Sequence, residues 1–127
     1  MVADASTPAA PARRPRPLLL EFAAASLVVG GLTGILGVIG STGPATPQLD
    51  VLVVGLNVLT IVVGLLVRAG RAWILSVNVA AVVLFIEITA LPSPFAIVFT
   101  AVDTIVLFAL IRHRDWFQPP TTEEPAA

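Results

Sequence analysis

Four long apolar runs separated by short polar connections dominate the chain. They cover about residues 18–40, 49–67, 72–91 and 95–111. Each run has roughly 17–23 residues, enough for an α-helix to cross a hydrocarbon core about 30 Å thick. Lipid offers no partner to open backbone groups, so we expect every run to be helical. β-Barrel strands would be shorter and would alternate in polarity. The pattern therefore predicts an all-α fold with four transmembrane helices.

The connections carry signals for helix starts and stops. Thr46 and Pro47 suit an N-cap and a first helical position, and Asp50 then lies where the helix dipole favours an anion. Gly70 suits a left-handed C-cap, and Ser93 suits the N-cap of the last helix. Because these loops are short, we expect consecutive helices to be antiparallel neighbours in an up-down-up-down four-helix bundle.

Two polar, Pro-rich segments flank the helical region. Residues 1–17 and 118–127 lack apolar periodicity and are expected to be disordered tails. Residues 18–117 then form a single transmembrane domain.

All seven basic residues are arginines, and they cluster before the first run, between the second and third, and after the fourth. Short loops rich in Arg stay on the cytoplasmic side, so this spacing predicts that both termini are cytoplasmic. Trp73 and Trp116 fall at the same predicted interface, where indole rings prefer to lie. The chain has no Lys and is rich in Ala, Val and Pro, which is typical of high-GC bacteria and favours the inner (plasma) membrane. The topology signal consists of Arg13, Arg14, Arg16, Arg68, Arg71, Arg112 and Arg114.

Composition narrows the functional classes. The chain is 57% hydrophobic and 12% charged, so its main partner is expected to be the lipid bilayer. It has no Cys, no Gly-rich phosphate loop, no His/Cys cluster and no nucleophile–base pair. We therefore expect neither an enzyme nor a cofactor or metal site. The basic residues flank membrane segments, which argues against binding of nucleic acid.

Polar residues within the last two runs form a candidate intramembrane site. Asp103 lies near mid-membrane, and Thr100 and Thr104 are expected on its face of the helix. Folding the hairpin brings Glu87 within about one turn of Asp103. Two facing carboxylates in a low dielectric repel each other, so at least one is expected to hold a proton. The group is either a proton or cation site, or a structural hydrogen bond from Asp103 with Glu87 reaching the headgroups.

The remaining intramembrane polar residues are candidates for helix packing. Asn57 and Asn78 can reach each other's helices, and Thr33 folds close to Asn57, which favours hydrogen bonds between helices over a polar pathway. Near the Arg-rich side, Glu21 is expected to pair with Arg68 or Arg71.

Small residues recur every four positions in the first run. Ser26, Gly30 and Gly34 form a seam that allows close approach of another helix. That helix belongs either to the same bundle or to a second copy of the chain.

Two resemblances bear on function. The length and the four runs resemble small multidrug-resistance transporters, but Glu21 lies at the membrane edge and the runs lack an aromatic cation pocket. The motifs Gly70-Arg-Ala-Trp73 and Asp103-xxx-Leu107, followed by Arg112-His-Arg-Asp-Trp-Phe117, resemble small four-pass membrane proteins of high-GC bacteria. That resemblance covers the second half and implies no particular activity.

Three functions remain open. The first is a non-enzymatic accessory or assembly subunit that acts through helix packing, as a homo-oligomer or within a larger membrane complex. The second is a small proton-coupled carrier that uses Asp103 and Glu87. The third is a regulator whose tails bind a soluble partner. A water-accessible cavity at Asp103 favours the carrier, whereas a closed contact to Thr or Asn favours packing.

Overall fold

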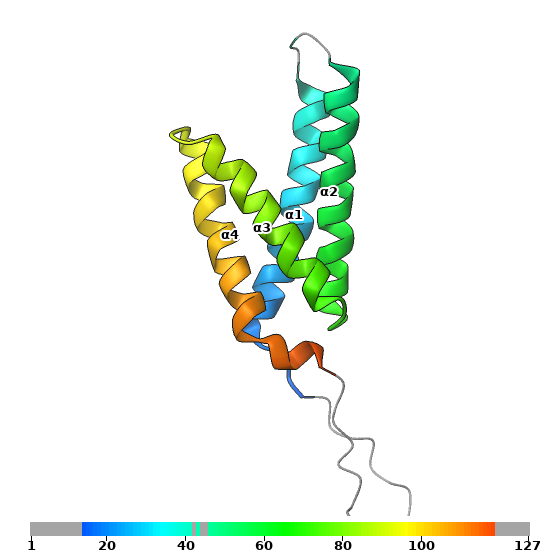
Figure 1. Cartoon of the computed structure of the whole chain (residues 1–127), viewed down its shortest axis with the longest axis vertical. Helices are drawn as coiled ribbons and strands as arrows, with labels where there is room; N and C mark the ends of the chain where they lie inside the picture. Colours follow the sequence, from blue (N-terminus) through cyan, green and yellow to red (C-terminus); the bar gives the residue numbers. More distant parts are fainter. Residues whose placement is uncertain (1–13, 42, 44–45, 119–127) are drawn as a thin grey trace, which may run out of the picture.

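The structure is a computed structural model that describes residues 14–41, 43 and 46–118. It contains four α-helices and one short 3-10 helix, η1 (Figure 1). Within the described residues there is no strand, so the expected all-α fold is confirmed. The helices begin and end within two residues of the predicted runs. Their bounds are α1 Leu18–Gly40, α2 Pro47–Arg68, α3 Trp73–Thr89, α4 Pro94–Arg112 and η1 Arg114–Phe117.

Three of these helices, α1, α2 and α4, are long and apolar enough to cross a membrane. The α3 helix is equally apolar but has 17 residues, which corresponds to about 26 Å. Most large apolar side chains on all four helices are exposed on the surface of the bundle. A soluble protein rarely exposes so large an apolar surface, whereas a membrane protein presents it to lipid.

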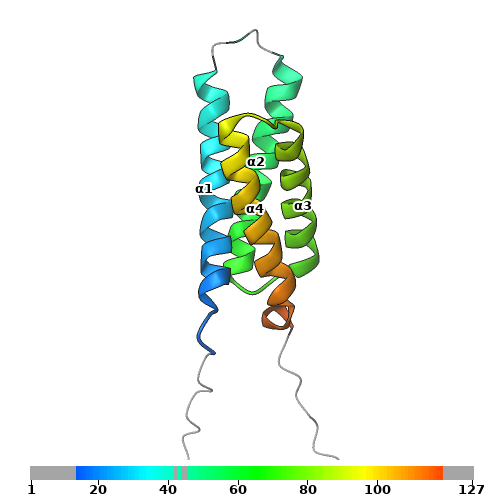
Figure 2. The same cartoon turned by 90° about the vertical axis from the view of Figure 1, so that its left-hand side faces the viewer.

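The chain folds as two helical hairpins. The α1 helix packs mainly against α2, and α3 packs mainly against α4, while α1 also contacts α4 and α2 contacts α3 (Figures 1 and 2). The start of α1, the loop between α2 and α3, and η1 all lie at one end, the Arg-rich end. The other end, called here the far end, carries the turns after α1 and α3. At the far end the two hairpins diverge, and the α1–α2 hairpin extends beyond the α3–α4 turn (Figure 1).

The α1–α2 contact depends on glycines that leave no room for a side chain. A Cβ on Gly31 would lie 2.6 Å from Ile61 Cγ1 and 2.7 Å from the backbone oxygen of Asn57. A Cβ on Gly34 would overlap the Asn57 side chain, and one on Gly64 would lie 3.0 Å from the backbone oxygen of Ala24. The face of α1 that contacts α2 is therefore rotated relative to the predicted seam. Gly34 packs inside the hairpin, which is one of the two predicted uses of the seam, but its companion in that contact is Gly31, because Gly30 faces elsewhere.

The hydrophobic core occupies the half of the bundle nearest the Arg-rich end. Its buried side chains come from the early turns of α1, the first half of α3 and the late turns of α2 and α4. This placement explains why the hairpins diverge at the far end, since few side chains fill the space between them there. The fully buried members are Leu20, Ala23, Val63, Val67, Val106, Ala109 and Leu110.

The α2–α3 loop follows the predicted glycine cap. Gly70 has φ +69°, its amide donates to Val67, and the amide of Arg71 donates to Leu66, which are the two hydrogen bonds of a Schellman motif. Ala72 also has a positive φ, at 58°.

Two local expectations differ from the structure. Thr46 and Ser93 occupy the N-cap positions, but neither side chain makes a capping hydrogen bond. The predicted pairing of Glu21 with Arg68 or Arg71 is wrong, because Glu21 pairs with Arg16. Arg16 lies in the extended residues just before α1, close to the first helical turn. The Arg16–Glu21 ion pair joins two residues close along the chain, so it forms without any contact between helices.

Candidate functional site

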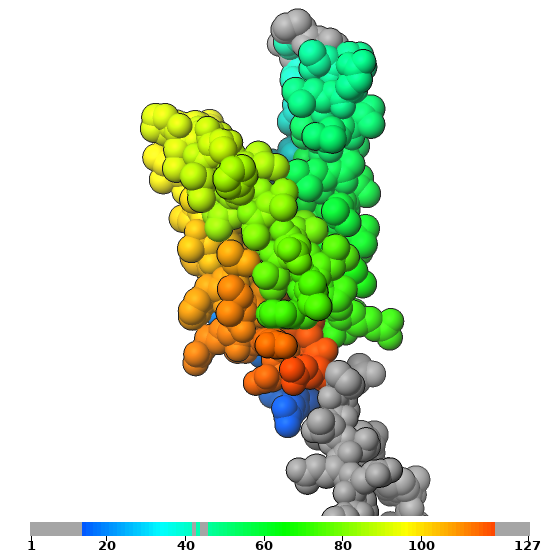
Figure 3. Space-filling model, viewed as in Figure 1, coloured from blue at the N-terminus to red at the C-terminus, as the bar shows by residue number. Residues whose placement is uncertain are grey.

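The gap between the hairpins forms a cavity of about 790 Å³, called here the cleft. It receives residues from all four helices and opens where the hairpins diverge (Figure 3). Its walls are mostly apolar and include Phe22 and Phe99. Drug-sized ligands occupy protein pockets of about 300–1,000 Å³ that are lined in this way. The polar lining residues are Ser26, Thr33, Asn57, Thr60, Glu87 and Asp103.

Asp103 is the most buried acidic residue of the described chain, with 9% of its surface exposed. It lies nine residues from each end of α4, or about 14 Å from either end. A carboxyl group at this depth is costly unless it has a partner or a use. No basic residue lines the cleft beside it.

Glu87 meets Asp103 from the neighbouring helix, as the sequence predicts. The two carboxyl groups lie close enough to interact with each other. Side chains on a helix tilt towards its N-terminus, so Glu87 on α3 leans towards the Arg-rich end while Asp103 on α4 leans towards the far end. These opposite tilts close the gap of about one turn that the hairpin register leaves. Glu87 Oε2 is buried and has no hydrogen-bond partner among the described atoms.

The two threonines predicted to share the site occupy different places. Thr104 is exposed, and its hydroxyl donates to the Thr100 carbonyl at 2.7 Å. Thr100 is half-buried, and its hydroxyl oxygen is buried without a partner in the described structure. Neither residue lines the cleft. The site at the cleft therefore contains the acidic pair, while Thr104 faces outward.

Other polar residues of the cleft turn their donors away from it. The hydroxyls of Thr33 and Thr60 donate to Val29 and Leu56 of their own helices, each at 2.8 Å. Asn57 Nδ2 likewise donates to Val53 at 2.8 Å. These bonds use a hydrogen atom of each side chain, so its oxygen remains free of that bond and can accept another.

The expected hydrogen bonds between helices do not form at the asparagines. Asn78 is exposed, and it donates to Ile74 of its own helix at 2.7 Å. Asn57 reaches α1 only through packing against Gly34. Each asparagine side-chain amide can donate to the backbone carbonyl four residues earlier, because that carbonyl is always within reach on the same helix.

Ser26 and Gly30 line the cleft instead of the α1–α2 contact. A Cβ built on Gly30 would meet nothing within 4 Å, and the same holds for Gly37, which lies outside the cleft. Part of the predicted seam is therefore open space between the hairpins.

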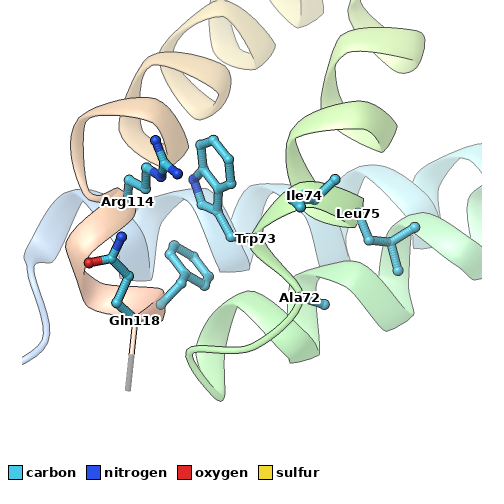
Figure 4. A pocket seen from close by; sticks show the side chains of 7 residues that line it. Ala72, Trp73, Ile74, Leu75, Arg114 and Gln118 are labelled. Atoms are coloured by element: carbon cyan, nitrogen blue, oxygen red, sulfur yellow. The ribbon is translucent and has the colours of Figure 1, made fainter. Parts of the chain in front are cut away.

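A second, smaller cavity of about 310 Å³ lies at the Arg-rich end (Figure 4). The Arg114 guanidinium lies 4.8 Å from the centroid of the Trp73 ring, a cation–π contact. Trp73 Nε1 also donates to the Leu110 carbonyl at 2.7 Å, which joins the start of α3 to the end of α4. Trp116 packs against Gly70. These contacts fasten η1 beneath the bundle, which indicates a structural role for this end.

No metal centre is visible among the described residues, since no group of three His, Cys, Asp or Glu side chains lies close enough together. No protein-family model, curated protein or solved structure matches the chain.

Proposed function

We propose that the protein is a four-pass integral membrane protein of a bacterial inner membrane, with both termini in the cytoplasm. The Arg-rich end supports this orientation, because Arg-rich flanks remain cytoplasmic. The short α3 helix crosses as the third pass, with small mismatch accommodated by the bilayer or by tilt of its neighbours. The cleft then opens on the outer side.

The topology is testable because the chain contains no Cys. Single substitutions Ser41→Cys and Ser93→Cys at the far end should react with a membrane-impermeant maleimide added to intact cells. Ala69→Cys at the Arg-rich end should react only after the cells are opened. Labelling of Ala69→Cys in intact cells, with Ser93→Cys protected, would contradict the proposal.

We further propose that the protein is a small carrier that exchanges protons for a cation at Glu87 and Asp103. The single observation that carries this proposal is that both carboxyl groups line one cleft, with Asp103 at the midpoint of α4. A buried acidic pair without a basic partner binds positive charge, either as protons or as a cation. A purely structural Asp103 would be closed in a contact with Thr or Asn.

Proteoliposomes provide the test. Vesicles that contain the purified protein and a trapped pH indicator are prepared with an acidic interior. A panel of inorganic and organic cations is then added outside. At least one cation should drive proton exit faster than in protein-free vesicles. If every cation leaves the proton flux at the protein-free level, the carrier proposal is rejected.

One observation favours an accessory or assembly function as a second candidate. Ser26 and Gly30 leave the cleft side of α1 open, so a helix of another copy or of a partner subunit has room to approach. Ser26→Cys should then form a crosslink in native membranes with a bifunctional reagent. A monomer without crosslinks, together with cation-driven proton flux, favours the carrier.

A further inference from the structure

The cleft combines features that restrict the chemistry of its ligand. This inference rests on the proposed carrier function and concerns its substrate class. The volume of about 790 Å³ is larger than a single metal ion needs, and the apolar walls offer such an ion no ligands. The acidic pair requires a positive charge. A ligand that satisfies both conditions has an apolar body and one cationic group.

The hydrogen-bonding groups of the cleft narrow the choice further. Thr33, Asn57 and Thr60 each direct a donor into their own helix, so their oxygens remain as acceptors. Ser26 adds a hydroxyl group to the lining, whose oxygen can also accept a hydrogen bond. The Glu87 and Asp103 carboxyl groups add further acceptors, and Glu87 Oε2 is buried without a donor. A cleft rich in acceptors selects a ligand that carries several N–H donors.

We propose that the cleft binds a primary organic ammonium ion with an apolar body, in exchange for one proton. A primary ammonium group brings a positive charge and three N–H donors. Exchange of one monovalent ion for one proton leaves the charge of the cleft unchanged, which avoids an uncompensated charge in an apolar medium. Among the described cleft-lining residues only Glu87 and Asp103 titrate; α1 contributes Ser26 and Thr33, and α2 contributes Asn57 and Thr60.

Three compounds that share the same apolar phenethyl group test this assignment. Phenethylammonium has charge and donors, phenethyltrimethylammonium has charge without N–H donors, and phenethyl alcohol has no charge. Calorimetry on the full chain in detergent should show phenethylammonium binding at least about tenfold tighter than the trimethyl compound, because hydrogen bonds to charged groups are strong. The alcohol should bind more weakly still. Equal binding of both cations, or of the alcohol, would overturn the assignment.

A matched pair of glycine variants locates the binding. Gly30→Leu places a side chain in the cleft, whereas Gly37→Leu places the same side chain in open space outside it. Gly30→Leu should weaken phenethylammonium binding at least about tenfold, since the added side chain fills the space where an apolar body is desolvated. Gly37→Leu should bind as the unchanged protein does, and both variants should melt at similar temperatures. Equal binding by the two variants would place the ligand elsewhere and overturn the proposal.

The proteoliposome panel separates this inference from the carrier proposal. If only inorganic cations drive proton exit, the ammonium assignment is wrong and the carrier function stands. If no cation drives proton exit, both are wrong. If phenethylammonium drives proton exit and the trimethyl compound does so at least about tenfold less effectively, both are supported.

Discussion

Replacing Asp103 with Asn is expected to abolish cation-driven proton exit in proteoliposomes, down to the level of protein-free vesicles. The amide has almost the same shape as the carboxyl group but cannot exchange a proton, and the only other titratable residue lining the cleft among those described is Glu87. The fold should survive, because the substitution removes a buried ionisable group and adds no volume. Circular dichroism and the melting temperature in detergent check that survival.

Two further variants serve as a control and a comparison for Asp103→Asn. Asp50→Asn makes the same chemical change in the first turn of α2, outside the cleft, and should leave the flux unchanged. Glu87→Gln should reduce the flux less than Asp103→Asn, because Glu87 is half-buried whereas Asp103 is nine-tenths buried. Proton exit at the original rate in Asp103→Asn would reject the assigned role of the carboxyl pair.

Gly31→Leu is expected to produce the largest loss of stability of any single change in the α1–α2 hairpin. The new Cβ would lie 2.7 Å from the Asn57 backbone oxygen and 2.6 Å from Ile61, and a backbone atom cannot rotate away. The two helices must then separate and give up their close contact. Overpacking typically costs about 1–3 kcal/mol, and we expect about 3 kcal/mol for a side chain of this size.

Reversible unfolding in mixed micelles measures this effect. The matched control is Gly37→Leu, whose Cβ meets nothing within 4 Å on the same helix, so its free energy of unfolding should change by less than about 0.5 kcal/mol. The smaller variant Gly31→Ala should fall between the two. Similar stabilities for Gly31→Leu and Gly37→Leu would contradict the observed helix contact.

Much of the fold is predictable because the apolar runs are long and the cap signals are local. Gly70 and Pro47 mark their helix boundaries through backbone chemistry that needs no tertiary information. The approach of Glu87 to Asp103 also follows from sequence, since a tight turn fixes the hairpin register. Each of these features involves residues close along the chain or joined by a short loop.

The divergence of the hairpins was not predictable in the same way. In a membrane helix every face is apolar, so the cleft-lining residue Phe99 and the outward-facing residue Phe108 look alike in the sequence. The rotation of α1 that places Gly31, and not Gly30, against α2 is likewise set by packing between helices. The hydrogen bonds of Asn57 and Asn78 were misassigned because a carbonyl of the same helix competes successfully with a distant partner.

The number of protons released for each phenethylammonium ion taken up tests the central claim most directly. Both fluxes are measured in the same proteoliposomes, with a trapped pH indicator and a radiolabelled ion. Above the flux of protein-free vesicles, the exchange at Glu87 and Asp103 predicts about one proton for each ion in the unchanged protein and no coupled flux in Asp103→Asn, since the exchange conserves charge. Uptake without proton release, or equal coupling in both proteins, would contradict it.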